Sequence, residues 1–381
     1  DTSGCQGCGN GVCDADEDRV TCAEDCGARQ IATGGLVSCS ILGTGDAFCW
    51  GNGASGMIGD GTFTANSLAS MVVGGLSHQA LSAGAGHMCS LTPAGLVYCW
   101  GNGEYLGAPN LEDTSVPRVV EGIPQVSSLS ASYWATCALG LLGEVICWGI
   151  DSNVTTRGMD RSPGPVQGLS SGMRIVSCGG MHCCALSAPE DLWCWGRNES
   201  GVLGVPGTTI AEVAVPVPIG LEVKQLAGGS NHHCLLDREG LVHCWGDTFF
   251  GQCAQPHTAN PVLTPMEVSL PEPAIKVVAG SEHSCALLES GKVYCWGGLT
   301  HYGDYLAQLG IGYASDGSTT PVEALVPVPS RDIETGHYTS CVATRDGRVF
   351  CWGQNSSGEA NPRAPGVKQH LPLEVSIPSN Q

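Results

Sequence analysis

The chain has 381 residues, and its 16 lysines and arginines against 36 aspartates and glutamates give a formal charge of −20 at pH 7. Phosphates and anionic lipids would repel so acidic a chain, which disfavours nucleic acid and acidic membranes as partners. No apolar run reaches the roughly 18 to 20 residues that a membrane helix needs, and the first residue is Asp rather than Met, so we expect a mature or trimmed soluble chain without a membrane span.

The N-terminal segment differs sharply from the rest of the chain. Residues 5–26, "CQGCGNGVCDADEDRVTCAEDC", contain five cysteines and six acidic side chains in 22 residues. So small a piece buries little apolar surface and needs bridges or metal to hold its shape. It is similar to short cysteine-rich segments, C-G-N-G-x-C-D … E-D … T-C-x-x-D-C-G, that accompany secreted bacterial domains. We assign residues 1–29 to this module, and the resemblance implies two disulfides, in undetermined pairing, among Cys8, Cys13, Cys22 and Cys26.

The acidic residues of this module resemble a calcium loop in their spacing. Four aspartates occupy relative positions 1, 3, 5 and 12 of such a loop. Arg19 stands where an EF-hand needs glycine, and position 12 is Asp rather than Glu, so a true EF-hand is not expected. A calcium site of another kind remains one prediction, and a solvated acidic spacer is the alternative. The candidate ligands are Asn10, Asp14, Asp16, Asp18 and Asp25.

From residue 30 onward one frame, seen as "CSLTPAGLVYCWG" at Cys89–Gly101, returns seven times with the spacing C-x9-C. In a hairpin with a central turn, residues ten apart face each other at a Cα separation of about 4.5 to 5.5 Å, within the disulfide range. Zinc sites usually contain short C-x2-C pairs of ligands, which the frames lack. We therefore predict seven hairpin disulfides and, from them, secretion. The pairs are Cys39–Cys49, Cys89–Cys99, Cys137–Cys147, Cys184–Cys194, Cys234–Cys244, Cys285–Cys295 and Cys341–Cys351.

The frames recur with a period of about 50 residues, which is typical of propeller blades or solenoid repeats. Both faces of the second frame strand are apolar, so it must lie between two sheets. A small-residue segment before each frame and a proline-marked segment after it each supply one more strand. Four strands per repeat predict an all-β, seven-bladed β-propeller over residues 30–381, with no helix of useful length.

The repeats resemble the regulator of chromosome condensation repeat family over about residues 30 to 379. Its units read G-x-x-H-x-x-A-L … G-x-V-x-x-W-G-x-N-x-x-G-x-L-G, and "WGRNESGVLG" at Trp195–Gly204 matches the tail. The resemblance implies a seven-bladed propeller, in a family that includes exchange factors on chromatin and secreted inhibitors that clamp β-lactamases with one face. Charge and disulfides disfavour the chromatin role here, and a fold match does not transfer an activity. The matching residues of one unit are Gly280, His283, Ala286, Leu287, Gly291, Val293, Trp296 and Gly297.

Four histidines stand two residues before a frame cysteine: His87, His182, His232 and His283. A ring of imidazoles near a propeller axis is one possible metal site. We favour the alternative that each repeated histidine satisfies a local backbone hydrogen bond, as a part of the fold. Of the remaining cysteines, Cys178 and Cys183 flank a small loop and could pair, which leaves Cys5 to reach Cys253 or to stay free.

The loops before the seven frames vary while the frames stay fixed, and propeller geometry gathers these loops on one face. Large amphipathic side chains in them are of the kind enriched at binding hot spots. The alternative is that the aromatic residues only cap the blades. Phe249 and Phe250, after the fifth Trp-Gly pair, are expected on another face. The predicted ligand-binding residues are Tyr133, Trp134, Asn231, Glu282, His337 and Tyr338.

The sequence contains no Gly-x-Ser-x-Gly elbow, no His-Glu-x-x-His motif and no P-loop. We therefore predict a binding protein, secreted or at the cell surface (extracellular or periplasmic), that meets a protein or glycan with one propeller face. No cofactor other than the possible calcium is expected. Two alternatives stay open: an extracellular enzyme with a site in the central channel, and a structural surface protein tethered through the N-terminal module.

Overall fold

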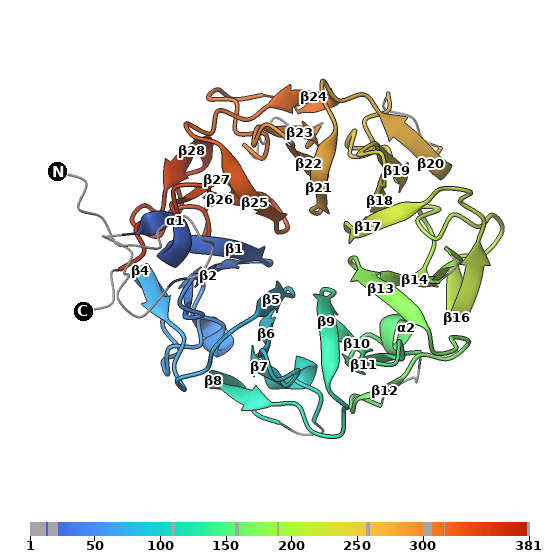
Figure 1. The fold of residues 1–381 in the computed structure, drawn as a ribbon, viewed down its shortest axis with the longest axis horizontal. Coiled ribbons are helices and arrows are strands. Elements are labelled where there is room, and N and C mark those ends of the chain that lie inside the picture. The colour runs from blue at the N-terminus through green and yellow to red at the C-terminus, as the bar shows by residue number, and fades with distance from the viewer. Residues whose placement is uncertain are drawn as a thin grey trace.

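The computed structural model describes residues 13, 22–108, 111–156, 160–188, 190–256, 260–299, 307–315 and 317–378. Seven four-stranded antiparallel sheets surround a central axis like the blades of a propeller (Figure 1). Each sheet uses four strands that are consecutive in sequence, and the first of them lies nearest the axis. The predicted all-β, seven-bladed propeller is confirmed.

The strands of the first four blades have the following bounds. Blade 1 contains β1 (Ala28–Thr33), β2 (Val37–Leu42), β3 (Ala47–Gly51) and β4 (Asn66–Met71). Blade 2 contains β5 (Ala80–Ala83), β6 (His87–Leu91), β7 (Val97–Gly101) and β8 (Thr114–Val119). Blade 3 contains β9 (Val126–Ala131), β10 (Ala135–Gly140), β11 (Val145–Gly149) and β12 (Gly164–Pro165). Blade 4 contains β13 (Met173–Cys178), β14 (His182–Ser187), β15 (Leu192–Arg197) and β16 (Ile210–Val217).

The last three blades follow the same plan. Blade 5 contains β17 (Val223–Gly228), β18 (His232–Asp237), β19 (Val242–Gly246) and β20 (Val262–Val268). Blade 6 contains β21 (Ala274–Ala279), β22 (His283–Leu288), β23 (Val293–Gly297) and β24 (Ser318–Glu323). Blade 7 contains β25 (Ser330–Thr335), β26 (Thr339–Thr344), β27 (Val349–Gly353) and β28 (Gln369–Glu374). The helices are short: α1 (Ala23–Cys26), α2 (Ser152–Thr155) and the 3-10 turns Ala54–Gly56 and Gly103–Tyr105. No helix in the described residues is long and apolar enough to cross a membrane.

Disulfides close the middle hairpin of every blade. In all seven frames the two cysteines lie directly opposite each other on the second and third strands, with a Cα separation of 4.1 Å. The seven predicted pairs are therefore confirmed. Cys178 and Cys183 also pair, between the first two strands of blade 4. Cys13 pairs with Cys26, Cys22 is disulfide-bonded as well, and Cys253 is a buried free thiol.

The frame tryptophans join each blade to the one before it. All seven are fully buried. The Trp100 indole donates to the carbonyl of Met57 at 2.9 Å, and the Trp245 indole donates to the carbonyl of Val202 at 2.8 Å. Four others bond in the same way, and Trp148 has no recorded partner in the described part of the chain. Each indole thus buries a large apolar surface between two sheets, and six of the seven satisfy their polar nitrogen there.

The glycine after each tryptophan is required by a close approach of two backbones. Gly101 ends β7 with a φ of 109°, a conformation that side chains other than glycine rarely adopt. A Cβ at Gly101 would lie 2.6 Å from the carbonyl oxygen of Gly86, in the loop before the frame. The same contact recurs at Gly246, where a Cβ would meet the Asn231 oxygen at 2.6 Å. The Trp-Gly pair is repeated because both of its members serve packing.

The ring closes between blades 1 and 7 without an exchange of strands. The backbone nitrogen of Ile31 donates to the Asp332 carboxylate at 2.8 Å, and that of Ala28 donates to the carbonyl of Gly347 at 2.9 Å. A buried apolar cluster that includes Phe48 and Val349 spans the same junction. Side-chain packing and a few hydrogen bonds therefore join the two ends of the repeat array.

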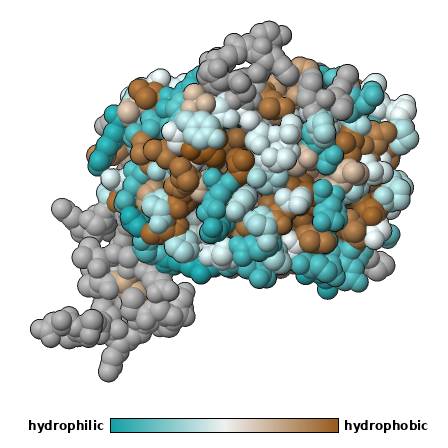
Figure 2. Space-filling view, turned by 90° about the horizontal axis from the view of Figure 1, so that it is seen from above, coloured by the Kyte–Doolittle hydropathy of each residue, from teal (hydrophilic) through white to brown (hydrophobic). Residues whose placement is uncertain are grey.

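Alternating strand directions give the disc two unlike faces. The loops between the first and second strands and between the third and fourth strands share one face, here called the loop face. The hairpin turns between the second and third strands form the opposite face, here called the turn face. On the rim, seen edge-on in Figure 2, apolar side chains lie among hydrophilic ones. Outer-strand residues such as Leu263 and Met266 are 36% and 43% exposed.

Candidate functional site

The loop face contains a cavity of about 380 Å³, here called the face pocket. Loops of blades 3 to 7 contribute to its wall, which combines aromatic, acidic and small polar residues. The wall therefore offers both apolar surface and hydrogen-bonding groups, the combination found at ligand sites. The lining includes Tyr133, Arg197, Glu199, Asn231, Phe250, Glu282 and Tyr338.

Tyr133 crosses the axis of the propeller. It leaves the loop after β9 of blade 3, and its hydroxyl hydrogen-bonds with Ser230 of blade 5 and, at 2.9 Å, with Ser281 of blade 6. Its ring lies 4.3 Å from that of His337, in blade 7. Four blades are thus tied together at the axis by one half-buried side chain.

The aromatic rings next to Tyr133 form a row on the loop face. The centroid of Trp134 lies 6.1 Å from that of Tyr133, edge to face, and the centroid of Tyr338 lies 6.4 Å from that of His337. These spacings fall within the range of attractive aromatic pairs, about 4.5 to 7 Å. Trp134, Tyr133, His337 and Tyr338 therefore make one continuous aromatic row built from blades 3 and 7.

The central channel lies beneath Tyr133 and has a volume of about 310 Å³. Its walls are the first strands of the blades, His337 lines it, and Tyr133 lines both the channel and the face pocket. Inside, the Lys276 ammonium contacts Asp332 at 2.7 Å and Glu334 at 3.3 Å. Burial alone would lower the pKa of Lys276, but these two carboxylates raise it above its usual value. The channel cation is thus already neutralised by its neighbours.

Glu282 is the carboxylate of the face pocket that lacks a positive partner. Desolvation raises the pKa of this half-buried group, the Tyr338 hydroxyl opposes that shift, and the charge of Asp247 adds to it. Tyr338 donates to Glu282 at 3.4 Å, and burial followed by the Glu282 charge raises the pKa of Tyr338 to about 12. Within the described residues no Lys, Arg or His forms an ion pair with Glu282, whereas Glu199 pairs with Arg197 at 4.0 Å.

The structure gathers most of the predicted ligand-binding residues. Tyr133, Asn231, Glu282 and Tyr338 line the face pocket. His337 lines the channel, and its ring centroid lies 4.3 Å from that of Tyr133. Trp134 is not among the lining residues of either cavity and packs against Tyr133 in a T-shaped arrangement. Their role in binding stays a prediction.

The predicted calcium ligands Asn10, Asp14, Asp16 and Asp18 lie outside the described residues. Asp25, the fifth candidate ligand, is buried beside blade 1. The calcium site stays a prediction.

The prediction for Phe250 was wrong, because it lines the face pocket with Tyr133 and Tyr338 rather than belonging to another face. The loops after the Trp-Gly pairs follow third strands, which run parallel to the first strands of their blades, so both loop types end on the loop face. Arg197 and Glu199 reach the pocket in the same way and were missed. The repeat pattern could have predicted this placement. Strand direction alternates within a blade, so the loop after the third strand lies on the same face as the loop after the first.

The four repeated histidines bond to the neighbouring blade instead of the local backbone that we expected. His87 Nε2 hydrogen-bonds with Thr136 at 2.7 Å, His232 with Ser284 at 2.8 Å and His283 with Ser340 at 2.9 Å. His182 Nε2 bonds with the Nδ1 atom of His233 at 3.1 Å. Burial lowers the pKa of His87 to about 4 and that of His182, His232 and His283 to about 3. These neutral imidazoles stabilise the junctions between blades.

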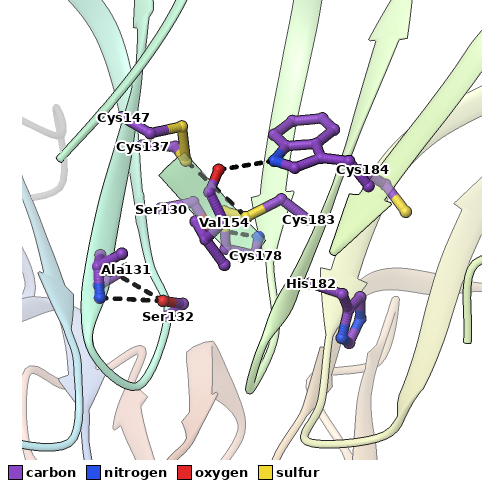
Figure 3. The surroundings of a disulfide bond; sticks show 12 residues. Ser130, Ala131, Ser132, Cys137, Cys147, Val154, Cys178, His182, Cys183 and Cys184 are labelled. Atoms are coloured by element: carbon purple, nitrogen blue, oxygen red, sulfur yellow. Dashed lines mark hydrogen bonds between the residues drawn. A yellow bond between two sulfur atoms is a disulfide. The ribbon is translucent and has the colours of Figure 1, made fainter. Parts of the chain in front are cut away.

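Three sulfur atoms converge between blades 3 and 4 (Figure 3). The Sγ atoms of Cys137, Cys178 and Cys183 all lie within 4.8 Å of one another, a spacing that could suit a metal ion. Cys178 and Cys183 are bonded to each other, and Cys137 is bonded to Cys147. Disulfide sulfurs are not thiolates, so in this state the group is a pair of stacked bridges rather than a metal centre.

Comparisons with known proteins agree with this architecture. A family model described as the RCC1-like domain matches residues 70–378. The chain is 28% identical over 316 residues to the mitochondrial RCC1 domain-containing protein RUG3 and to the ultraviolet-B receptor UVR8, both of Arabidopsis thaliana. These matches cover 79% of this chain, 59% of RUG3 and 70% of UVR8.

The crystal structure of Prp20p from Saccharomyces cerevisiae superimposes with a TM-score of 0.76. The alignment covers 93% of this chain and 88% of that one at 20% identity, which establishes likeness of fold. The repeats, the seven blades and the match of the family model together show that this chain belongs to the RCC1-like domain family.

Proposed function

We propose that this chain is a binding protein, secreted or displayed at a cell surface, which engages a protein partner through its loop face. The observation that carries the proposal is the aromatic row of Trp134, Tyr133, His337 and Tyr338 beside the face pocket. Tyrosine and tryptophan are enriched at hot spots of protein interfaces because they bury much area at low entropic cost. Hydrogen bonds and ring contacts already fix these side chains, which reduces the ordering cost of binding.

A protein partner is also consistent with the relatives. The structural study of Prp20p concerns its binding to Gsp1p and histones, and UVR8 is named as a receptor. Those activities belong to those proteins. For this chain they support only the general idea that an RCC1-like propeller offers a face to other proteins. The acidic charge of −20 makes a basic partner surface more favourable than an acidic one.

An oxidising location is supported by the sulfur chemistry. Each blade carries its own frame disulfide, and further bridges lie in blade 4 and before blade 1. A reducing cytosol rarely maintains such bridges, whereas secreted and surface proteins commonly do. These bridges support our proposal of a location outside the cytosol.

Affinity capture with paired variants tests the proposed function. The double variant Trp134→Ala plus Tyr338→Ala removes two members of the aromatic row. The double variant Leu96→Ala plus Leu142→Ala removes exposed apolar side chains, 44% and 81% exposed, from the turn face and serves as the matched control. Extracts of the outer surface and medium of the source cells are passed over each immobilised protein. We expect one protein to be captured by the native chain and the control and lost from the loop-face variant.

Equal capture by both variants would contradict the proposal. A carbohydrate retained by the native chain in place of a protein would replace the protein partner with a glycan. Variant folding is checked beforehand by comparing thermal melts under non-reducing conditions.

A further inference from the structure

The face pocket holds a negative charge that its own walls do not compensate. The Glu282 carboxylate is half-buried, and among the described residues its one side-chain hydrogen bond is a long one of 3.4 Å from Tyr338. The neighbouring Asp247 adds negative charge, as its effect on Glu282 shows. Arg197, the cation of the pocket wall, lies instead beside Glu199, at 4.0 Å. A desolvated carboxylate of this kind gains most from a cationic partner that also donates hydrogen bonds.

The backbone holds Glu282 in place. Its carbonyl oxygen accepts a hydrogen bond from the backbone nitrogen of Gly298 at 2.7 Å. The backbone nitrogen of the preceding Ser281 donates to the carbonyl oxygen of His337 at 3.0 Å. The following residue, His283, is fully buried and bonded to Ser340 at 2.9 Å. The backbone from which the carboxylate projects is therefore fixed by the fold before any ligand arrives, which reduces the entropic cost of binding.

Aromatic side chains line the pocket that contains this carboxylate. Tyr338, Phe250 and Tyr133 all line the same pocket as Glu282. A planar guanidinium can stack on such rings through its faces while it donates to a carboxylate along its edge. An ammonium group lacks the flat surface for stacking, and an anion would be repelled by both Glu282 and Asp247.

From this arrangement we infer that the face pocket receives an arginine side chain of the partner protein, with Glu282 as its counter-ion and Tyr338 and Phe250 as its aromatic walls. The inference rests on the proposed function, because it assumes that the loop face is the binding face. Long-range attraction from the acidic chain would guide a basic segment toward the pocket. Tyr133 lines both the face pocket and the central channel.

Peptide binding to the whole chain tests this inference. The probe is acetyl-Gly-Gly-Arg-Gly-Gly-amide, and the comparison peptide carries citrulline, which has nearly the same shape without the charge. Ligand-observed NMR titration gives both affinities. We expect the arginine peptide to bind about tenfold or more tightly than the citrulline peptide, which is the effect of one charge-assisted hydrogen bond.

Two matched variants locate the effect. Glu282→Gln keeps the size of the side chain and should abolish the preference for arginine. Glu239→Gln removes one equal charge from the turn face, where Glu239 is exposed, and should retain the preference. Equal affinity for the two peptides, no binding of the arginine peptide at millimolar concentration, or an unchanged preference in Glu282→Gln would each overturn the inference.

The two proposals can fail separately. If Trp134→Ala plus Tyr338→Ala abolishes capture of the partner and Glu282→Gln leaves it unchanged, the loop face binds without an arginine in the pocket. If neither variant affects capture, the loop face itself is the wrong surface.

Discussion

At the residue scale, the histidines of the blade junctions show how burial alters an ordinary side chain. Imidazole titrates near pH 6.5 in water. His87 and His283 are fully buried, and desolvation lowers their pKa values to about 4 and about 3. Each donates or accepts one hydrogen bond with a hydroxyl of the next blade and stays neutral. Their charge state in the folded protein is therefore insensitive to physiological changes in pH.

This burial predicts that acid weakens the fold. The folded pKa of His87 is about 4, below the value of about 6.5 in the unfolded chain, so the unfolded state takes up the proton first as the pH falls. The contribution of neutral His87 to the free energy of unfolding is complete above about pH 6.5, and it is lost as the pH falls from that value to the folded pKa. Denaturant titrations under non-reducing conditions measure the free energy of unfolding at pH 7.5 and at pH 5.0. Between these two values, the free energy of unfolding of His87→Gln should fall by about 2 kcal/mol less than that of the native chain. An identical loss in both proteins would show that His87 is not held neutral.

Tyr133 marks the limit of what the sequence predicts at a single residue. The repeat predicts that its loop lies with those of His337 and Tyr338 on one face. It does not reveal that the Tyr133 hydroxyl reaches Ser230 and Ser281 across the axis. That contact depends on the width of the channel and on which loops carry small residues, and neither follows from one blade. The period identifies loops that share a face, and the side chains that meet depend on packing across it.

At the element scale, the junctions between blades follow a pairing rule. Each of the four repeated histidines lies two residues before the first cysteine of its frame. Its partner lies in the next blade, one residue before the first cysteine of that frame, and is always polar. Examples are His232 with Ser284 and His283 with Ser340. At the junction of blades 1 and 2, the corresponding residues are Val37 and Met88, and both are buried in one apolar cluster. The second strands therefore match polar to polar and apolar to apolar from one blade to the next.

A double-mutant cycle tests this pairing. His283→Ala and Ser340→Ala each leave a buried polar partner, so each should destabilise the fold by about 1 to 3 kcal/mol. The double variant should cost less than the sum of the two, with a coupling of about 0.5 to 1.5 kcal/mol. Val37→Ala combined with Ser340→Ala, which involves separate junctions, provides the additive control. Additivity in the first cycle would mean that the hydrogen bond contributes nothing to the junction.

The strands themselves were predictable from local sequence. The C-x9-C frames specify which residues face each other, and a cross-strand disulfide is possible only in that register. The face of Phe250 was mistaken because the frame was read without counting strand directions. A single frame does not predict the histidine contacts, because the polar partner of each histidine lies in another repeat.

At the scale of the whole molecule, the seven sequence repeats predict seven blades. They do not predict how the first and last blades meet to close the ring. Asp332 bonds the backbone of Ile31 across the junction of the first and last blades. Nothing in a period of about 50 residues indicates how the two ends meet. The disc that results gathers loops of consecutive blades around one axis. The aromatic row and the face pocket exist only because distant repeats converge there.

The central claim is that the partner binds on the loop face. Hydrogen exchange of the native chain with and without the captured partner measures this directly, because amides covered by a partner exchange more slowly. We predict protection of residues 132–135, 247–252, 280–282 and 336–338, with unchanged exchange in the turn-face hairpins at 140–143, 238–240 and 289–291. Protection confined to those hairpins or to the outer strands of the rim would contradict the claim.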